Sequence, residues 1–178
     1  MSDEMLDLVD DEDRVVGRAR RSEVHGNPDR LHRVVHVLVF DREGRIFLQK
    51  RGPGKLVQPN RWDTSVGGHV DAGESREAAV RRELAEELGI PGPGGTVPEL
   101  RFLHRYRHGN EFESELVSTW ICRWDGPVNT QDDEISEGRF WDPADIDRRR
   151  PADGGAGPFT PNFLDELDRW RAAGSPRP

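Results

Sequence analysis

One predicted helix constrains this chain more than any other feature of its sequence. Ser75 is a residue type that caps helix starts, Gly89 is one that ends helices, and Pro91 prevents further helical turns. Between these signals, apolar residues recur every four positions, which is the spacing of a buried stripe: Val80, Leu84 and Leu88. The pattern therefore predicts a helix over 76–88 that packs one face against a core.

The same helix carries a cluster of negative charge. Glu83, Glu86 and Glu87 stand at i, i+3 and i+4, so they occupy about 100° of one side. Like charges at this spacing destabilise a helix by about 0.2–0.5 kcal/mol per pair, and acidic groups near a helix end oppose its dipole. A divalent cation removes both penalties because hard cations prefer oxygen ligands. The alternative is a solvated acidic face balanced by neighbouring arginines: Arg76, Arg81 and Arg82.

The wider spacing favours the metal site. Gly68 is followed by five residues and Glu74, and then by seven residues and the run RELAEELGI at 82–90. Residues 68–90 resemble the motif of the Nudix superfamily, G-x5-E-x7-R-E-U-x-E-E-x-G-U with U aliphatic, at every specified position. The resemblance implies an α/β protein, built as an α/β/α sandwich with a mixed β-sheet.

The resemblance also implies roles for the motif residues. The catalytic carboxylates and one backbone carbonyl would bind Mg²⁺ or Mn²⁺: Glu83, Glu86, Glu87 and Gly68. Glu74 would pair with Arg82 and hold the preceding loop against the helix. The bound cation would neutralise charge at phosphorus and acidify a water molecule.

Hydrolysis also needs a carboxylate that orients or deprotonates the attacking water. Glu83 is the first choice for this general base. Candidates outside the helix are Glu113, Glu115 and the acidic cluster Asp132-Asp133-Glu134, for which a solvated loop is the competing interpretation.

Outside the motif, the chain resembles the type 1 isopentenyl-diphosphate isomerases, a branch of the same superfamily. The resemblance rests on RLH at 30–32, QKR at 49–51, WDTSVGGH at 62–69 and ESE at 113–115. It implies a second metal site with five ligands: His25, His32, His69, Glu113 and Glu115. Imidazole ligands would favour Mn²⁺ or Zn²⁺ there, although a single histidine taken alone is more often a surface or packing residue. The resemblance further implies that Arg51 and Lys55 contact a substrate diphosphate.

The isomerase chemistry itself is missing from the sequence. Those enzymes move protons on carbon with a cysteine and a glutamate. Glu115 fills the glutamate position, but Gly67 stands at the cysteine position and Cys122 lies in a different predicted strand. The sequence therefore favours hydrolysis of a diphosphate linkage in a nucleoside diphosphate derivative or another X-linked diphosphate. An isomerase-like enzyme and a non-catalytic nucleotide-binding sensor are the alternatives.

Composition bounds the remaining possibilities. A chain of 178 residues with 33% apolar and 34% charged residues predicts one domain over 1–178, with its core at about 6–172. The single cysteine and the lack of a signal peptide or membrane-spanning run predict a cytoplasmic protein with no membrane partner. A net charge of −8 argues against general nucleic-acid binding. A small-molecule diphosphate is the expected partner, and a homodimer stays open.

Alternating apolar residues and turn signals predict further elements. Strands are expected as a hairpin over 6–9 and 14–16, a second hairpin over 31–40 and 46–49, an interrupted pair over 62–70 around Gly67 and Gly68, and strands at 100–106, 116–124 and 139–141. Asp142-Pro143 and Thr160-Pro161 each predict a helix start. The second of these helices presents an apolar face: Phe163, Leu164, Leu167 and Trp170.

Overall fold

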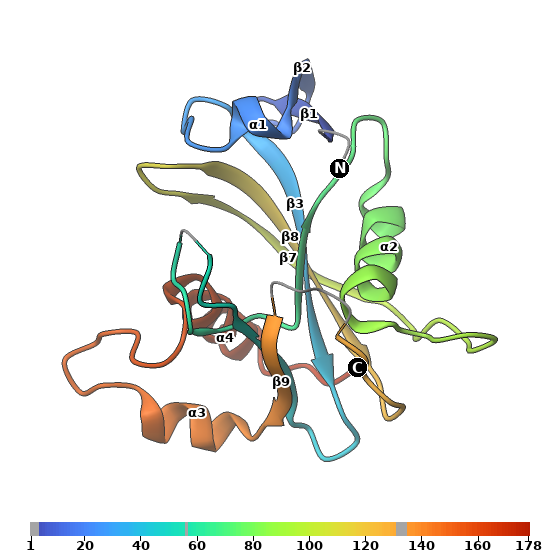
Figure 1. Cartoon of the computed structure of the whole chain (residues 1–178), viewed down its shortest axis with the longest axis vertical. Coiled ribbons are helices and arrows are strands. Elements are labelled where there is room, and N and C mark those ends of the chain that lie inside the picture. Colours follow the sequence, from blue (N-terminus) through green and yellow to red (C-terminus); the bar gives the residue numbers. More distant parts are fainter. Residues whose placement is uncertain (1–3, 56, 131–134) are drawn as a thin grey trace.

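Strand β3 (His32–Phe40) runs through the centre of a mixed sheet that helices cover on both sides (Figure 1). The structure is a computed structural model and describes residues 4–55, 57–130 and 135–178. Over these residues the other strands are β1 (Met5–Val9), β2 (Val15–Arg20), β4 (Ile46–Arg51), β5 (Trp62–Asp63), β6 (Val66–His69), β7 (Arg101–Gly109), β8 (Ser114–Arg123) and β9 (Ile135–Trp141). The helices are α1 (Arg21–Val24), α2 (Arg76–Leu88), α3 (Pro143–Arg149) and α4 (Pro161–Ala172). Among these helices, none has the length and apolar character needed to cross a membrane.

β3 is almost entirely buried because it is paired along both edges. One edge pairs in parallel with β8 over the whole strand, from His32 opposite Glu115 to Phe40 opposite Arg123. The other edge is shared in turn by β1, β6 and β4. β6 occupies the edge along residues 34–37, which leaves β4 a single pair between Phe40 and Ile46.

The hairpin predicted over 31–40 and 46–49 is therefore present, but its two strands pair only next to the turn and then diverge. β4 pairs instead with β9 and β5. The fully buried Ser65 hydroxyl accepts a hydrogen bond from the Val39 amide at 2.9 Å and donates one to the Phe47 carbonyl at 2.5 Å. The Ser65 hydroxyl thus occupies one backbone group on β3 and one on β4 that a longer hairpin would have used for pairing.

Side chains on the two faces of β3 pack into two separate cores, because successive side chains of a strand point to opposite faces. On one face, Leu38 and Phe40 pack with α3 and α4 through residues such as Ile146 and Phe163. On the other face, the alternate residues Val35, Val37 and Val39 pack against the apolar stripe of α2. The sheet is therefore a layer between helices, which agrees with the expected α/β/α sandwich (Figure 1).

Helix α2 forms where its sequence signals place it. The Ser75 side chain accepts a hydrogen bond from the Ala78 amide at 3.2 Å, which satisfies one of the free amides at the helix start. Gly89 ends the helix with φ of 63°, a left-handed conformation that glycine adopts without steric cost. The predicted stripe of Val80, Leu84 and Leu88 is buried, and Ala79 and Glu83 are buried as well.

Other predicted elements are partly corrected. The hairpin of β1 and β2 is present, and the predicted apolar face of α4 is buried. The interruption of the 62–70 segment falls at residues 64–65, whereas Gly67 and Gly68 lie inside β6 and pair with His36 and Val35. The strand predicted at 139–141 is longer, and the short helix α1 was not predicted.

Candidate active site

The three motif carboxylates lie on α2 in different environments. Glu83 is buried, Glu87 is half-buried and Glu86 is exposed. Glu83 faces strand β6 so closely that an ideal Cβ on Gly68 would lie 2.0 Å from the Glu83 carboxyl carbon. With the Glu83 side chain in this position only glycine fits at residue 68, and the backbone of β6 lies against the Glu83 carboxylate. The two residues that the motif resemblance pairs in a metal site therefore lie next to each other.

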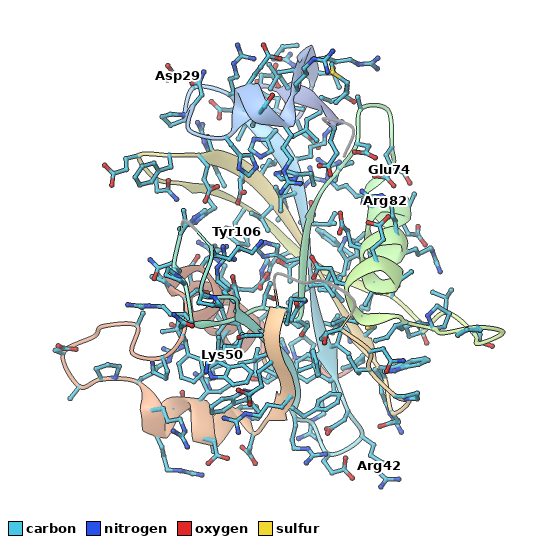
Figure 2. The ribbon with its side chains drawn as sticks, in the orientation of Figure 1. Asp29, Arg42, Lys50, Glu74, Arg82 and Tyr106 are labelled. Carbon is cyan, nitrogen blue, oxygen red and sulfur yellow. The ribbon has the colours of Figure 1, made fainter. Side chains whose placement is uncertain are left out.

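Arg82 donates hydrogen bonds to several other residues of the motif. It donates two hydrogen bonds to Glu74, from Nε at 3.1 Å and from Nη2 at 2.9 Å. Its Nη1 also donates to Glu83 at 2.7 Å and to Glu86 at 3.2 Å, and its Nη2 donates to the His69 carbonyl at 2.9 Å. The predicted pairing of Glu74 with Arg82 is present, and Figure 2 shows the two side chains next to each other beside α2.

Burial and charge shift the pKa values of these carboxyl groups in opposite directions. Burial raises the pKa of Glu83, and Glu86 adds to the rise, although Arg82 opposes it. For Glu74, burial also raises the pKa, but hydrogen bonds from Arg82 and from the Asp71 amide outweigh it, so that the pKa is lowered. Glu74 therefore stays ionised beside Arg82, whereas Glu83 holds a proton more readily than an ordinary glutamate does.

The third carboxylate connects α2 to the predicted diphosphate-binding residues. Gln49 Nε2 donates to Glu87 Oε2 at 2.6 Å, and Gln49 pairs in register with Asp63 on β5. Asp63 in turn accepts a hydrogen bond from Arg51 Nη1 at 3.0 Å. Lys55 lies half-buried in the loop that follows β4. Arg51 lies two residues after Gln49 along β4 and contacts a carboxylate in this structure.

The histidines and glutamates of the predicted second metal site also come together. Ligand atoms of His32, His69 and Glu115 all lie within 4.8 Å of one another. His25 joins this group, since its Nε2 lies 3.3 Å from Nε2 of His69. Glu113 lies within the same distance limit of Glu115 and His108. These residues come from α1, β3, β6 and β8 and from the segments next to them, so the fold itself gathers them.

His32 has an unusual hydrogen-bonding state. Its side chain is buried, and its Nδ1 donates to the Arg30 carbonyl at 3.0 Å, so Nε2 carries a lone pair. That Nε2 is buried and has no hydrogen-bond partner in the part of the chain that the structure describes. A buried polar atom without a partner is costly and calls for an explanation. A cation bound among His32, His69 and Glu115 provides one, and the donor set fits a transition metal.

The charges around this second cluster favour neutral imidazoles. Burial lowers the pKa of His32, and burial together with the neighbouring His32 lowers the pKa of His69 to about 3. Burial also raises the pKa of Glu115 to about 7, and the nearby Glu113 adds to that rise. Neutral imidazole is the form that binds metals.

His108 was missed by the sequence analysis. It pairs directly with Glu115 in the hairpin of β7 and β8. The strands at 100–106 and 116–124 were predicted, and extending their pairing toward the turn between them would have found the pair. The acidic residues Asp132, Asp133 and Glu134 lie outside the described residues.

Comparison with known proteins gives a consistent family assignment. A family model described as the NUDIX domain matches residues 30–163. An uncharacterized Nudix hydrolase of Streptomyces coelicolor is 37% identical over 98% of this chain and 94% of its own length. An isopentenyl-diphosphate Delta-isomerase of Streptomyces avermitilis is 31% identical over 95% of this chain and 84% of its own length.

A solved structure gives the same result for the fold. The crystal structure of the Deinococcus radiodurans protein DR0079 matches with a TM-score of 0.76 at 27% identity, and the match covers 93% of this chain and 98% of that one. The expected α/β/α fold is therefore confirmed. With a complete motif whose helix lies against Gly68 and a family match over most of its length, the chain belongs to the Nudix family and is a Nudix hydrolase.

Proposed function

We propose that this protein cleaves the diphosphate linkage of a nucleoside diphosphate derivative, or of a related X-linked diphosphate, with Mg²⁺ or Mn²⁺. The observation that carries the proposal is the contact between Glu83 and Gly68, where only a glycine lets the backbone reach the carboxylate. A close backbone approach to a buried carboxylate supports a cation site, because both supply hard oxygen ligands.

The residues of α2 and β6 would have different roles in such a site. Glu83, Glu86, Glu87 and Gly68 would hold the cation, which when bound neutralises charge on the phosphate oxygens and acidifies water. Glu83 is our candidate for the general base, since a buried carboxyl with a raised pKa is closer to the working pH of a proton acceptor. Arg82 keeps Glu83 and Glu86 in place from one side, and Gln49 holds Glu87 from the other.

The histidine and glutamate cluster is proposed as a second metal site. Its ligands would be those that the isomerase resemblance implies: His25, His32, His69, Glu113 and Glu115. The unpartnered Nε2 of His32 supports this proposal independently of any resemblance. Mn²⁺ or Zn²⁺ suits the imidazole ligands better than Mg²⁺.

Isomerisation of an isoprenoid diphosphate is the second candidate, and the 31% identity to an isomerase favours it. The chain lacks the thiol that this reaction needs, because Gly67 stands at the cysteine position and has no side chain. Cys122 does not replace that thiol: it is fully buried among residues packed against α2, and burial raises its pKa to about 12. Glu115 precedes it in β8 by an odd number of residues, and alternation along a strand turns the two side chains to opposite faces.

A substrate screen tests the two candidates together. The protein is incubated with nucleoside diphosphates, nucleotide sugars, dinucleotides and isopentenyl diphosphate, each with Mg²⁺ or Mn²⁺, and both phosphate products and isomerised lipids are measured. Metal-dependent release of phosphate or of a nucleoside monophosphate supports the proposed function. Double-bond migration without phosphate release would replace it with the isomerase, and the absence of turnover on every compound would reject both.

A further inference from the structure

A buried ion pair lies beneath Gly67 on the face of the sheet that α4 covers. Nδ1 of His36 lies 3.1 Å from Oε1 of Glu166, and Glu166 is fully buried. The hydroxyls of Thr119 and Thr64 donate to the two oxygens of Glu166 at 2.7 and 2.9 Å. The Glu166 carboxylate is thus fully partnered within the core, and it fixes the orientation of the His36 ring.

The opposite edge of the His36 ring points toward Gly67. The two residues pair across β3 and β6, and an ideal Cβ on Gly67 would lie 3.3 Å from both Cδ2 and Nε2 of His36. Gly67 is exposed, whereas His36 is only 6% exposed. Because residue 67 has no side chain, a polar atom of a buried ring lies directly under an exposed stretch of backbone.

The charges around His36 indicate which kind of group this place accepts. Burial lowers the pKa of His36, but Glu166, with smaller contributions from Glu115 and Asp63, raises it to about 9. A protonated ring donates through Nε2 as well as through Nδ1. Glu166 already balances its charge, and the further carboxylates nearby repel an additional anion. The place therefore suits an uncharged hydrogen-bond acceptor better than a phosphate or an alkyl chain.

We infer that Gly67 and His36 form a subsite that binds the nucleoside part of a diphosphate substrate, with a base or sugar oxygen accepting a hydrogen bond from Nε2 of His36. This inference rests on the proposed function and specifies its substrate class. Gly68, the next residue along β6, faces Glu83 on the opposite side of the sheet, so the subsite and the motif carboxylates lie against the same two-residue stretch of backbone. An isoprenoid chain at the same place would leave a buried polar atom unpaired, which selects strongly against such a ligand.

Substitutions at the two residues test the subsite through substrate discrimination. Gly67→Val fills the space over His36 without backbone strain, since residue 67 lies in a strand and has no positive φ. His36→Gln keeps a polar side chain but removes the ring edge. Each variant should raise KM for the preferred nucleoside diphosphate roughly tenfold, as expected for one lost hydrogen bond. Neither should change the inhibition constant of isopentenyl diphosphate against that substrate by more than a small factor.

Leu38→Val is the control for loss of stability. Leu38 lies two residues further along β3 on the same face and contributes only apolar packing. It should lower the melting temperature and leave both KM for the nucleoside diphosphate and the inhibition constant of isopentenyl diphosphate unchanged. An equal loss of affinity for both compounds in Gly67→Val and His36→Gln would overturn the subsite.

A binding measurement separates this inference from the proposed function. The ¹⁵N and ¹H signals of the His36 ring are followed by NMR in a Glu87→Gln background, while a nucleoside diphosphate or isopentenyl diphosphate is added with Mg²⁺. A shift of the Nε2 signal with the nucleoside diphosphate alone supports the subsite, even if the screen finds no hydrolysis and the proposed function fails. An unchanged Nε2 signal at saturating nucleoside diphosphate, or an equal shift with both compounds, would overturn it.

Discussion

The carboxyl group of Glu83 occupies the space that a side chain at Gly68 would need, with 2.0 Å between its carbon and the ideal Cβ position. Gly68→Ala must therefore push Glu83 away or move β6. We expect a loss of metal-dependent turnover on the order of 10²-fold, because small displacements of reacting groups are costly. Overpacking should also lower the free energy of unfolding by about 1–3 kcal/mol. Steady-state rates and urea denaturation check the two effects.

Gly17→Ala provides the matched control for this substitution. Gly17 also lies in a strand, and a Cβ there would meet only Leu8 Cδ1 at 3.9 Å, which is an ordinary contact. This variant should keep both turnover and stability. If Gly68→Ala behaved like Gly17→Ala, the contact between Glu83 and Gly68 would have no part in catalysis.

Glu87→Gln should abolish metal-dependent turnover while the fold stays intact. The side chain is half-buried and accepts a hydrogen bond from Gln49, which an amide oxygen can still accept, so little stability is lost. Rates are measured over a range of Mg²⁺ concentrations alongside Glu77→Gln, a change on the same helix to a residue whose partner is Arg81. Undiminished turnover of Glu87→Gln at saturating Mg²⁺ would reject its role as a ligand.

Glu83→Gln distinguishes a general base from a residue that only helps to bind metal. If Glu83 accepts the proton of the attacking water, kcat should fall by roughly 10²- to 10⁴-fold. The metal affinity, measured by calorimetry, should fall less than it does in Glu87→Gln. A loss in kcat below tenfold would move the role to a carboxylate outside the helix, with Glu113 and Glu115 the first to be tested.

Local patterns predicted α2 well because its signals lie within one short stretch. The caps at Ser75 and Gly89 and the apolar stripe depend on neighbouring residues alone, and all are present in the structure. The main partners of β4 were not predicted, because its pairing depends on β6 and on the buried Ser65, which are distant in sequence. Pairing between distant strands has no local signature of comparable strength.

The burial of Glu166 is a second feature that local sequence patterns do not predict. Its position is on the predicted apolar face of α4, three residues after Phe163, yet a glutamate there gives no sign of being fully buried. Its burial depends on His36, Thr64 and Thr119, which come from β3, the segment before β6, and β8. A single sequence does not link such residues. The resemblance to known families pointed to the candidate metal ligands, but the His36 pair required coordinates.

Stability should fall as the pH rises from 7 to 9 because of the ion pair between His36 and Glu166. The pKa of His36 is raised to about 9 in the folded protein, so its contribution is fully present below the unfolded value of about 6.5 and is lost as the pH rises through the folded value. The expected loss is on the order of 1–3 kcal/mol. Urea denaturation at several pH values measures it. The decrease should be absent in His36→Gln, and an identical decrease in that variant would contradict the assignment.

Mn²⁺ or Zn²⁺ should stabilise the protein through the cluster that contains His32. A ligand that binds only the folded state at 100 times its dissociation constant adds about 2.7 kcal/mol, so the melting temperature should rise with added metal. His32→Gln should remove most of that rise, because it removes the unpartnered Nε2. His104→Gln is the matched control, since its Nε2 is also buried without a partner among the described residues but belongs to neither group of potential metal ligands found there. An equal metal response in both variants would mean that the cation binds elsewhere, and the second site would have to be abandoned.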